Sequence, residues 1–329
     1  MIRIALVFLE VGQRFDPLGS QHGLMSISAV LKHNGFPEVR LIHFVGRIDL
    51  GRWRKELSEY DPGLIGFYLA GSQVGLVRKL IAEMPNRAGG APFTICGGPH
   101  TTCYPKSIEE IAGLDAICVG EGEYVMLELA QALQEGKDPT RIPGLWVRHN
   151  GRIVRNKPRP FIPNLDELPY EDWDLFDTQH SIDAYGLTQI RVMASRGCPY
   201  RCTYCFNHRL REAQPGRYVR FRSTDHLLGE LKMLKSRFRF REVFFDDDIF
   251  MLDKRRLAEF AERYPREVGV PFIFCGRVEV CDRETVKLLK KAGARRIAMG
   301  VEVGNEELRR TVLRRPMSNR QIMETALAA

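Results

Sequence analysis

The chain has 329 residues and a formal net charge of +8, and 44% of its residues are hydrophobic against 27% charged. This balance indicates a packed globular protein, long enough for two domains. No stretch reaches the roughly 18 apolar residues of a membrane span, and the apolar N-terminus lacks the charged leader and cleavage site of a signal peptide. We therefore expect a cytoplasmic protein. Its basic residues are dispersed, which argues against a nucleic-acid partner.

Short apolar runs alternate with amphipathic stretches over the first 135 residues. The apolar runs predict five strands, at residues 2–8, 39–44, 64–70, 93–98 and 115–120. Helical patterns separate and follow them, at residues 20–34, 50–59, 73–84, 104–112 and 123–135. Because the strands are almost entirely apolar, we expect a parallel sheet covered on both faces, in a doubly wound, Rossmann-like α/β fold. Ligands bind such sheets beyond the carboxyl ends of the strands.

Residues 136–185 are rich in proline, asparagine and acidic residues. Residues 145–156 predict a β-hairpin with Asn150–Gly151 as its tight turn. The prolines that follow predict an extended, non-helical linker up to residue 185. Aromatic side chains in this linker fit the role of packing anchors. They are Phe161, Tyr170, Trp173 and Phe176.

Strands and helices alternate again from residue 188. The predicted strands lie at 189–195, 242–246, 271–275 and 296–301, and the helices at 224–236, 253–264, 282–292 and 305–314, with a last helix from Asn319. Four such units do not close a barrel. The predicted domains are an α/β domain at 1–136, a hairpin and Pro-rich linker at 137–187, and an incomplete (β/α) partial barrel at 188–329.

Three of the eight cysteines stand close together, at Cys198, Cys202 and Cys205, with Cys-x3-Cys-x2-Cys spacing. Three thiolates on one loop can bind three irons of a [4Fe–4S] cluster and leave the fourth iron open. The alternative is a zinc site with His208 as fourth ligand. Several of the remaining cysteines stand in apolar runs, as expected for small residues of a hydrophobic core. A disulfide framework is not expected in a chain of this length without an export signal.

This cysteine loop resembles the signature of the radical S-adenosylmethionine (SAM) superfamily. The resemblance implies that SAM binds the open iron, and that an electron from the cluster breaks its S–C5′ bond to give a 5′-deoxyadenosyl radical. It also implies an external electron donor such as flavodoxin or ferredoxin. The SAM-binding residues that it implies are Tyr204 beside the adenine, Asp246 and Asp247 at the amino group, and Glu302 at the ribose.

Two alternatives stay open for the residues around SAM. A solvated acidic turn is an equally ordinary role for at least one of the three aspartates at 246–248. Arg277 follows a predicted strand and could reach the SAM carboxylate, but the sequence favours a surface position for it.

The first domain resembles the cobalamin-binding domain of one radical SAM class, which includes methyltransferases and ring-forming cyclases. Segments 17–36, 69–73, 96–105 and 119–123 carry this resemblance, each where a loop leaves a strand for a helix. Glycines in such loops let backbone approach a flat corrin, and helix N-termini favour its phosphate. The implied cobalamin-binding residues are Gly71, Ser72, Gly97, Gly98, Pro99, His100, Gly120, Glu121 and Gly122.

The cobalt-ligating Asp-x-His-x-x-Gly motif of many cobalamin proteins does not occur, although His22 and His100 lie in relevant loops. The alternative is that these glycines only turn the chain. The class resemblance implies methyl transfer to an unactivated carbon, or a ring-forming or other oxidative reaction, on a small-molecule or natural-product substrate.

Two rival functions remain. A tRNA methylthiotransferase would hold a second cluster on Cys96, Cys103 and Cys118, but Cys118 falls in a predicted buried strand. A truncated, non-catalytic cofactor-binding module is the other, because related barrels contain further strands beyond the four predicted here.

Overall fold

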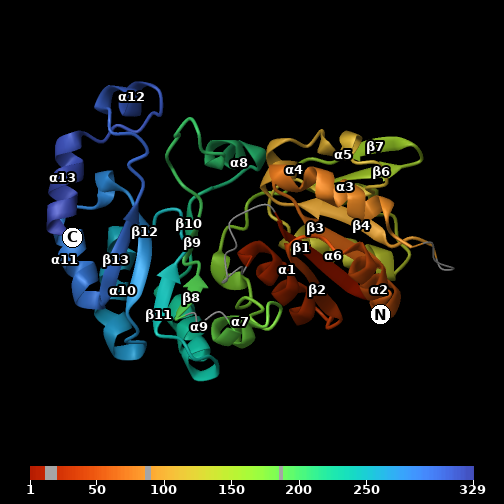
Figure 1. Cartoon of the computed structure of the whole chain (residues 1–329), viewed down its shortest axis with the longest axis horizontal. Helices are drawn as coiled ribbons and strands as arrows, with labels where there is room; N and C mark the ends of the chain where they lie inside the picture. Colours follow the sequence, from red (N-terminus) through yellow and green to blue (C-terminus); the bar gives the residue numbers. More distant parts are fainter. Residues whose placement is uncertain (12–20, 86–89, 185–187) are drawn as a thin grey trace. The chain divides into compact units, whose positions relative to one another are not determined.

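The computed structural model describes residues 1–11, 21–85, 90–184 and 188–329. The chain divides into two compact units (Figure 1). Unit 1 comprises Met1–Ile162, Leu168–Asp177 and Glu212–Gly216, and unit 2 comprises Pro163–Glu167, Thr178–Arg211 and Arg217–Ala329. In the ranges that are described, no helix combines the length and apolar character needed to cross a membrane.

Unit 1 is built on a seven-stranded sheet with the order β2-β1-β3-β4-β5-β6-β7. Its first five strands pair in parallel and confirm the five predicted ones. They are β1 (Ile4–Val11), β2 (Val39–Gly46), β3 (Leu64–Tyr68), β4 (Phe93–Gly97) and β5 (Ala116–Cys118).

The predicted hairpin is present as β6 (Leu145–His149) and β7 (Arg152–Arg155). Its turn residues Asn150 and Gly151 have φ values of 49° and 73°, the left-handed pair that a type I′ turn requires. The sequence did not predict its partner: β6 pairs antiparallel with β5, with Ile117 opposite Trp146. The hairpin therefore extends the first sheet.

Helices cover both faces of this sheet (Figure 1). On one face α2 (Leu50–Tyr60) and α3 (Val74–Ala82) bury Trp53, Leu57 and Leu80 against the inward side chains of β1 and β3. On the other face α1 (His22–His33) packs beside α6 (Glu123–Gln134). This is the doubly wound arrangement that the sequence predicts.

The helix predicted at 104–112 is wrong in its bounds, because the structure has two short helices there, α4 (Pro99–Cys103) and α5 (Ser107–Glu110). Gly98 has a φ of 108°, and Pro99 then begins α4 at its first position, where a proline is well tolerated. Residue 20, the predicted start of the first helix, lies outside the described residues.

Unit 2 contains a four-stranded parallel sheet with the order β13-β12-β11-β8, which confirms the four predicted strands. These are β8 (Gln189–Val192), β11 (Glu242–Phe245), β12 (Phe272–Gly276) and β13 (Ala294–Met299). The main helices are α9 (Thr224–Arg237), α10 (Lys254–Glu267), α11 (Arg283–Ala292), α12 (Glu306–Thr311) and α13 (Asn319–Ala328). Phe245, Phe260 and Phe272 are fully buried between sheet and helix, and stack edge to face.

The linker contains one helix that the sequence did not predict, α7 (Thr178–Ala184). The prolines that argued against a helix, Pro158 to Pro169, all precede it, so none interrupts this segment. The aromatic anchors are confirmed for the residues that pack in unit 1: Phe161 and Trp173 are buried, and Phe176 meets Phe8 edge to face at 6.0 Å.

Candidate functional site

The three clustered cysteines lie on one loop between β9 (Ser195–Arg196) and α8 (Asn207–Ala213), just beyond the carboxyl end of β8. Gly197 has a φ of 92°, and a Cβ there would lie 2.5 Å from the Tyr218 carbonyl oxygen, so only glycine fits before Cys198. The Cys205 N–H donates to the Cys202 carbonyl at 3.1 Å and tightens the loop. All eight cysteines of the chain are free thiols.

These three thiols stand on one loop, as the three protein ligands of a cubane cluster do. Burial raises the pKa of Cys198 to about 11, and a thiol binds a metal as the thiolate, so its proton has to leave when iron binds. A cubane gives each thiolate its own iron, whereas the alternative zinc site with His208 would place all three on one ion.

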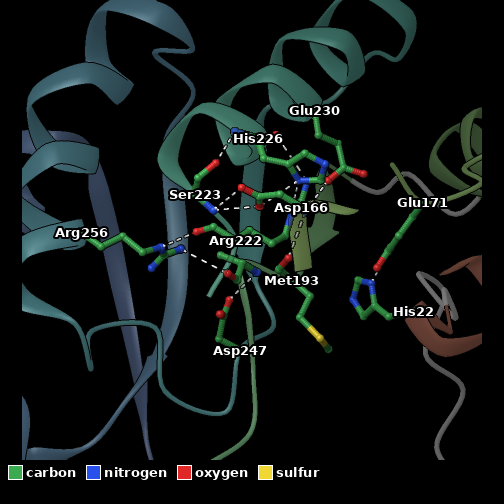
Figure 2. Close-up of polar contacts among 11 residues, drawn as sticks. His22, Asp166, Glu171, Met193, Arg222, Ser223, His226, Glu230, Asp247 and Arg256 are labelled. Carbon is green, nitrogen blue, oxygen red and sulfur yellow. Dashed lines mark hydrogen bonds and ion pairs between the residues drawn. The ribbon is translucent and has the colours of Figure 1, made fainter. Parts of the chain in front are cut away.

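The backbone that leads into the cysteine loop is held by buried charged side chains (Figure 2). The Asp247 carboxylate accepts from the Ala194 N–H at 3.1 Å and from the Ser195 hydroxyl. Arg256 donates to the Ala194 carbonyl at 3.3 Å and Arg222 donates to the Met193 carbonyl at 3.2 Å. Hydrogen bonds from three side chains thus hold residues 193–195 before the first cysteine.

The three consecutive aspartates have three different environments. Asp247 is buried, which raises its pKa, and both of its oxygens are engaged by residues 194 and 195. Asp246 accepts from Arg191 at 2.7 Å, and Asp248 accepts from the Asn207 side chain at 2.7 Å. Although Asp248 as a whole residue is exposed, burial of its carboxyl raises the pKa of that group. The solvated-turn alternative and the amino-group role of Asp246 and Asp247 both stay predictions.

Tyr204 and Glu302, predicted to contact SAM, are brought together by a residue that sequence reasoning missed. Arg315 is buried and donates to the Tyr204 hydroxyl at 2.8 Å and to the Gly300 carbonyl at 2.6 Å. Its Nη1 also lies 3.6 Å from Glu302 Oε1. A half-exposed tyrosine, a carboxylate and a buried guanidinium therefore form one polar cluster from the cysteine loop and the end of β13.

Backbone geometry explains how Glu302 reaches this cluster. Glu302 has a φ of 68°, which is uncommon for a residue with a side chain and marks a local constraint. Gly300 permits it, because a Cβ at that position would clash with the Glu302 carboxylate. The cysteine loop is also tied to the same region, since Thr203 donates its N–H to the Leu313 carbonyl at 3.2 Å.

Arg277 is not a surface residue, which corrects that interpretation of the sequence. Only 5% of it is exposed, and its Nη1 donates to Cys202 Sγ at 3.2 Å. Its guanidinium carbon lies 3.7 Å from the centroid of the Tyr200 ring, and its remaining nitrogens face Glu279. The sequence carries no signal for this contact, which spans 75 positions.

In unit 1, the loops after β3 and β4 meet at His100. Gly71 and Ser72 lie in a short 3-10 helix (Gly71–Gln73), and Gly97–Gly98 precede Pro99 and His100 at the start of α4. A Cβ on Gly71 would lie 3.6 Å from His100 Nδ1. The Nε2 of His100 is buried and has no hydrogen-bond partner among the residues that the structure describes, so a bound polar group would satisfy it. These loops fit a ligand such as cobalamin.

The Gly120–Glu121–Gly122 loop is covered by the chain itself. A Cβ on Gly120, whose φ is 102°, would clash with the Gln214 side chain. The Glu121 N–H donates to Gln214 Oε1 at 2.9 Å, and the Glu121 carboxylate accepts from the Ile162 N–H at 2.8 Å. Gly120 therefore has a structural role in this loop, and the contact of the loop with cobalamin stays a prediction.

Two other predicted features of unit 1 have ordinary roles in the structure. Within segment 17–36, residues 17–20 lie outside the described residues, and the rest begins α1, where His22 Nδ1 lies 2.8 Å from Glu171 Oε2 (Figure 2). Cys96 and Cys118 are fully buried in β4 and β5, and burial raises both thiol pKa values, that of Cys118 to about 12. Such protonated core thiols are poor ligands for a second cluster.

Comparison with known proteins supports both halves of the sequence prediction. The model described as the Radical SAM superfamily matches residues 192–329, and the one described as B12 binding domain matches residues 8–130. An uncharacterised methyltransferase of Pyrococcus horikoshii is 30% identical over 250 residues, which are 75% of this chain and 53% of that protein. The anaerobic magnesium-protoporphyrin IX monomethyl ester cyclase of Rubrivivax gelatinosus is 23% identical over 84% of this chain and 50% of its own.

Among solved structures, the radical SAM methyltransferase TsrM of Kitasatospora setae has the same fold, with a TM-score of 0.75 at 19% identity over 99% of this chain and 65% of its own. The chain spans about half the length of the curated relatives it matches. Both domain types and the cysteine loop agree with the resemblance read from the sequence. Residues 192–329 are thus a radical SAM domain and residues 8–130 a B12-binding domain, so the chain carries the two domains of the cobalamin-binding radical SAM class, whose cofactors are a [4Fe–4S] cluster, SAM and cobalamin.

Proposed function

We propose that this chain is the catalytic part of a cobalamin-dependent radical SAM methyltransferase, which cleaves SAM reductively and methylates an unactivated carbon of a small-molecule or natural-product substrate. The observation that carries the proposal is the loop of Cys198, Cys202 and Cys205 beyond β8, in the same unit as the Tyr204–Arg315–Glu302 cluster. The methyltransferase names of relatives in Pyrococcus horikoshii and Streptomyces wedmorensis support methyl transfer.

Each part of the site has a proposed task. Cys198, Cys202 and Cys205 hold the cluster, Asp246 and Asp247 lie toward the SAM amino group, and Tyr204 lies against the adenine. Glu302 accepts from the ribose hydroxyls, and Arg315 orients both Tyr204 and Glu302 through its contacts of 2.8 and 3.6 Å. When bound, the cluster supplies the electron that cleaves SAM and cobalamin supplies the carrier for a methyl group.

The proposed cobalamin contacts come from the strand ends of unit 1. The loops at Gly71–Ser72 and Gly97–His100 present backbone and the buried His100 Nε2, while Gly120–Gly122 contributes through its backbone. An electron donor such as flavodoxin or ferredoxin would reduce the cluster. The division into domains at residues 136 and 187, and a cytoplasmic location, stay predictions.

A ring-forming, oxidative reaction is the second candidate, and the match to the Rubrivivax cyclase favours it. The tRNA methylthiotransferase is not proposed, because two of the three cysteines that would hold its second cluster are core residues of unit 1. The non-catalytic module is not proposed either, since it has no positive observation in its favour.

Product analysis separates these functions. The 329-residue protein, reconstituted without oxygen and reduced with titanium(III) citrate, is expected to convert SAM to 5′-deoxyadenosine, and Cys198→Ala is expected to form none. With hydroxocobalamin present, methyl transfer to cobalamin should also release S-adenosylhomocysteine, whereas a ring-forming enzyme should release only 5′-deoxyadenosine. A preparation with about four irons per chain that leaves SAM intact would contradict the proposal.

A further inference from the structure

Arg277 is a charged residue beside Cys202 that has no task in the proposed SAM-binding site. Arg277 is buried just after β12, and 75 positions separate it from Cys202 in the sequence. Its Nη1 donates to Cys202 Sγ at 3.2 Å, a normal distance for a hydrogen bond to sulfur. Burying a charge is costly unless it is paired. The Glu279 carboxylate pairs with only one edge of this guanidinium, so the donor aimed at a cysteine ligand calls for an explanation of its own.

Glu279 determines which nitrogen reaches the sulfur. The Glu279 carboxylate accepts from Arg277 Nε at 3.2 Å and from Nη2, so it occupies one edge of the planar guanidinium. The other edge, with Nη1, then points at Cys202. Tyr200 closes the arrangement, since its ring stacks on the guanidinium at 3.7 Å. Arginine suits this task because its donors lie in a rigid plane.

We propose that Arg277 is a positioning residue that tunes the cluster, raising its reduction potential through the hydrogen bond to Cys202 Sγ, with Glu279 limiting the effect. This inference rests on the proposed function. One-electron reduction adds a negative charge to the cluster and its ligands. A positive hydrogen-bond donor at a ligand sulfur stabilises that reduced form more than the oxidised form, and hydrogen bonds to sulfur are one of the factors that set cluster potentials.

The proposal predicts opposite shifts for the two partners. Arg277→Gln removes the charge. It is expected to shift the equilibrium about tenfold toward the oxidised cluster, which corresponds to a reduction potential about 59 mV more negative for a one-electron couple. Glu279→Gln removes the opposing charge and keeps the donor, so it is expected to shift the equilibrium several-fold toward the reduced cluster. Arg277→Lys keeps the charge but loses the planar set of guanidinium donors, so its reduction potential should lie between those of the wild type and Arg277→Gln.

The experiment is an anaerobic redox titration of the reconstituted 329-residue protein, followed by electron paramagnetic resonance, with iron per chain measured on each sample. Arg266→Gln is the matched control, because it removes one positive charge from a side chain that is 70% exposed on α10. Its potential should equal that of the wild type.

The outcomes distinguish this inference from the function it rests on. Failure of the wild type to take up iron would overturn the proposed function itself. Full iron content with an unchanged potential in Arg277→Gln would make the residue a structural clamp only and overturn the inference. If Arg277→Gln cannot hold the cluster, Glu279→Gln decides, since an unchanged or lower potential there would equally overturn it.

Discussion

Replacement of Cys202 by alanine is expected to abolish the visible absorbance of the reconstituted cluster and reduce bound iron from about four per chain to nearly none. Two remaining thiolates, Cys198 and Cys205, are too few to hold a cubane. Cys202 is also the most enclosed of the three, buried under the Arg277 guanidinium, so solvent cannot easily replace its sulfur as a ligand. The measurement is the visible spectrum with an iron assay after anaerobic reconstitution.

Cys281→Ala is the matched control for that experiment. Cys281 is a buried free thiol in the same unit, but it stands outside the cysteine loop, between a short 3-10 helix and α11. Its replacement should leave spectrum and iron content unchanged, apart from a small loss of stability from a shrunken core side chain. A Cys202→Ala protein with the wild-type spectrum would show that the cluster assignment is wrong.

Loss of Glu302 or Arg315 is expected to have the second largest effect, a weaker affinity for SAM with the cluster intact. A hydrogen bond to a charged group contributes about 1.5–3 kcal/mol, so Glu302→Ala should raise the Kd of SAM about 10- to 100-fold. Arg315→Gln should act in the same direction, because Tyr204 loses its 2.8 Å donor and the carboxylate loses its neighbouring cation. Isothermal titration calorimetry on the reconstituted protein measures both.

Glu307→Ala is the control for this pair, since Glu307 is an exposed acid in the first turn of α12, five positions further along the chain. The Glu307→Ala protein should bind SAM as tightly as the wild type. If Glu302→Ala and Arg315→Gln both retain iron and bind SAM as tightly as the wild type, the polar cluster at the end of β13 has no part in SAM binding.

The parallel strands were predictable because each is a short, apolar run bounded by turn residues. The runs at 64–70 and 93–98, for example, became β3 and β4, and burial on both faces leaves no other pattern for such strands. The cysteine loop was predictable for a similar reason, since all three ligands lie within eight residues. Such features are local, so the sequence displays them directly.

The contacts that complete the site were not predictable, because they join residues far apart in the chain. Arg315 meets Tyr204 across 111 positions, and Gln214 covers Gly120 from 94 positions away (214 − 120). An arginine in the run LRRP looks the same whether it faces solvent or lies buried against a tyrosine. Only the three-dimensional packing distinguishes these cases, and the same holds for the antiparallel pairing of β6 with β5.

Asp247 shows how a local pattern can point to a region without assigning each residue. Three aspartates follow the end of β11, and the sequence predicts SAM-binding residues among them. Burial sets Asp247 apart, because a buried carboxylate needs hydrogen-bond donors and finds them at residues 194 and 195. Besides its proposed task at SAM, Asp247 therefore supports the start of the cysteine loop.

One chain is expected to hold a cluster at the cysteine loop and a cobalamin in the first domain, and the metal content per chain decides whether it does. The 329-residue protein would be reconstituted without oxygen with iron, sulfide and hydroxocobalamin, desalted, and assayed for iron and cobalt. We predict about four irons and one cobalt per chain. Iron without cobalt would contradict the cobalamin half of the account, and an absence of both metals would contradict it entirely.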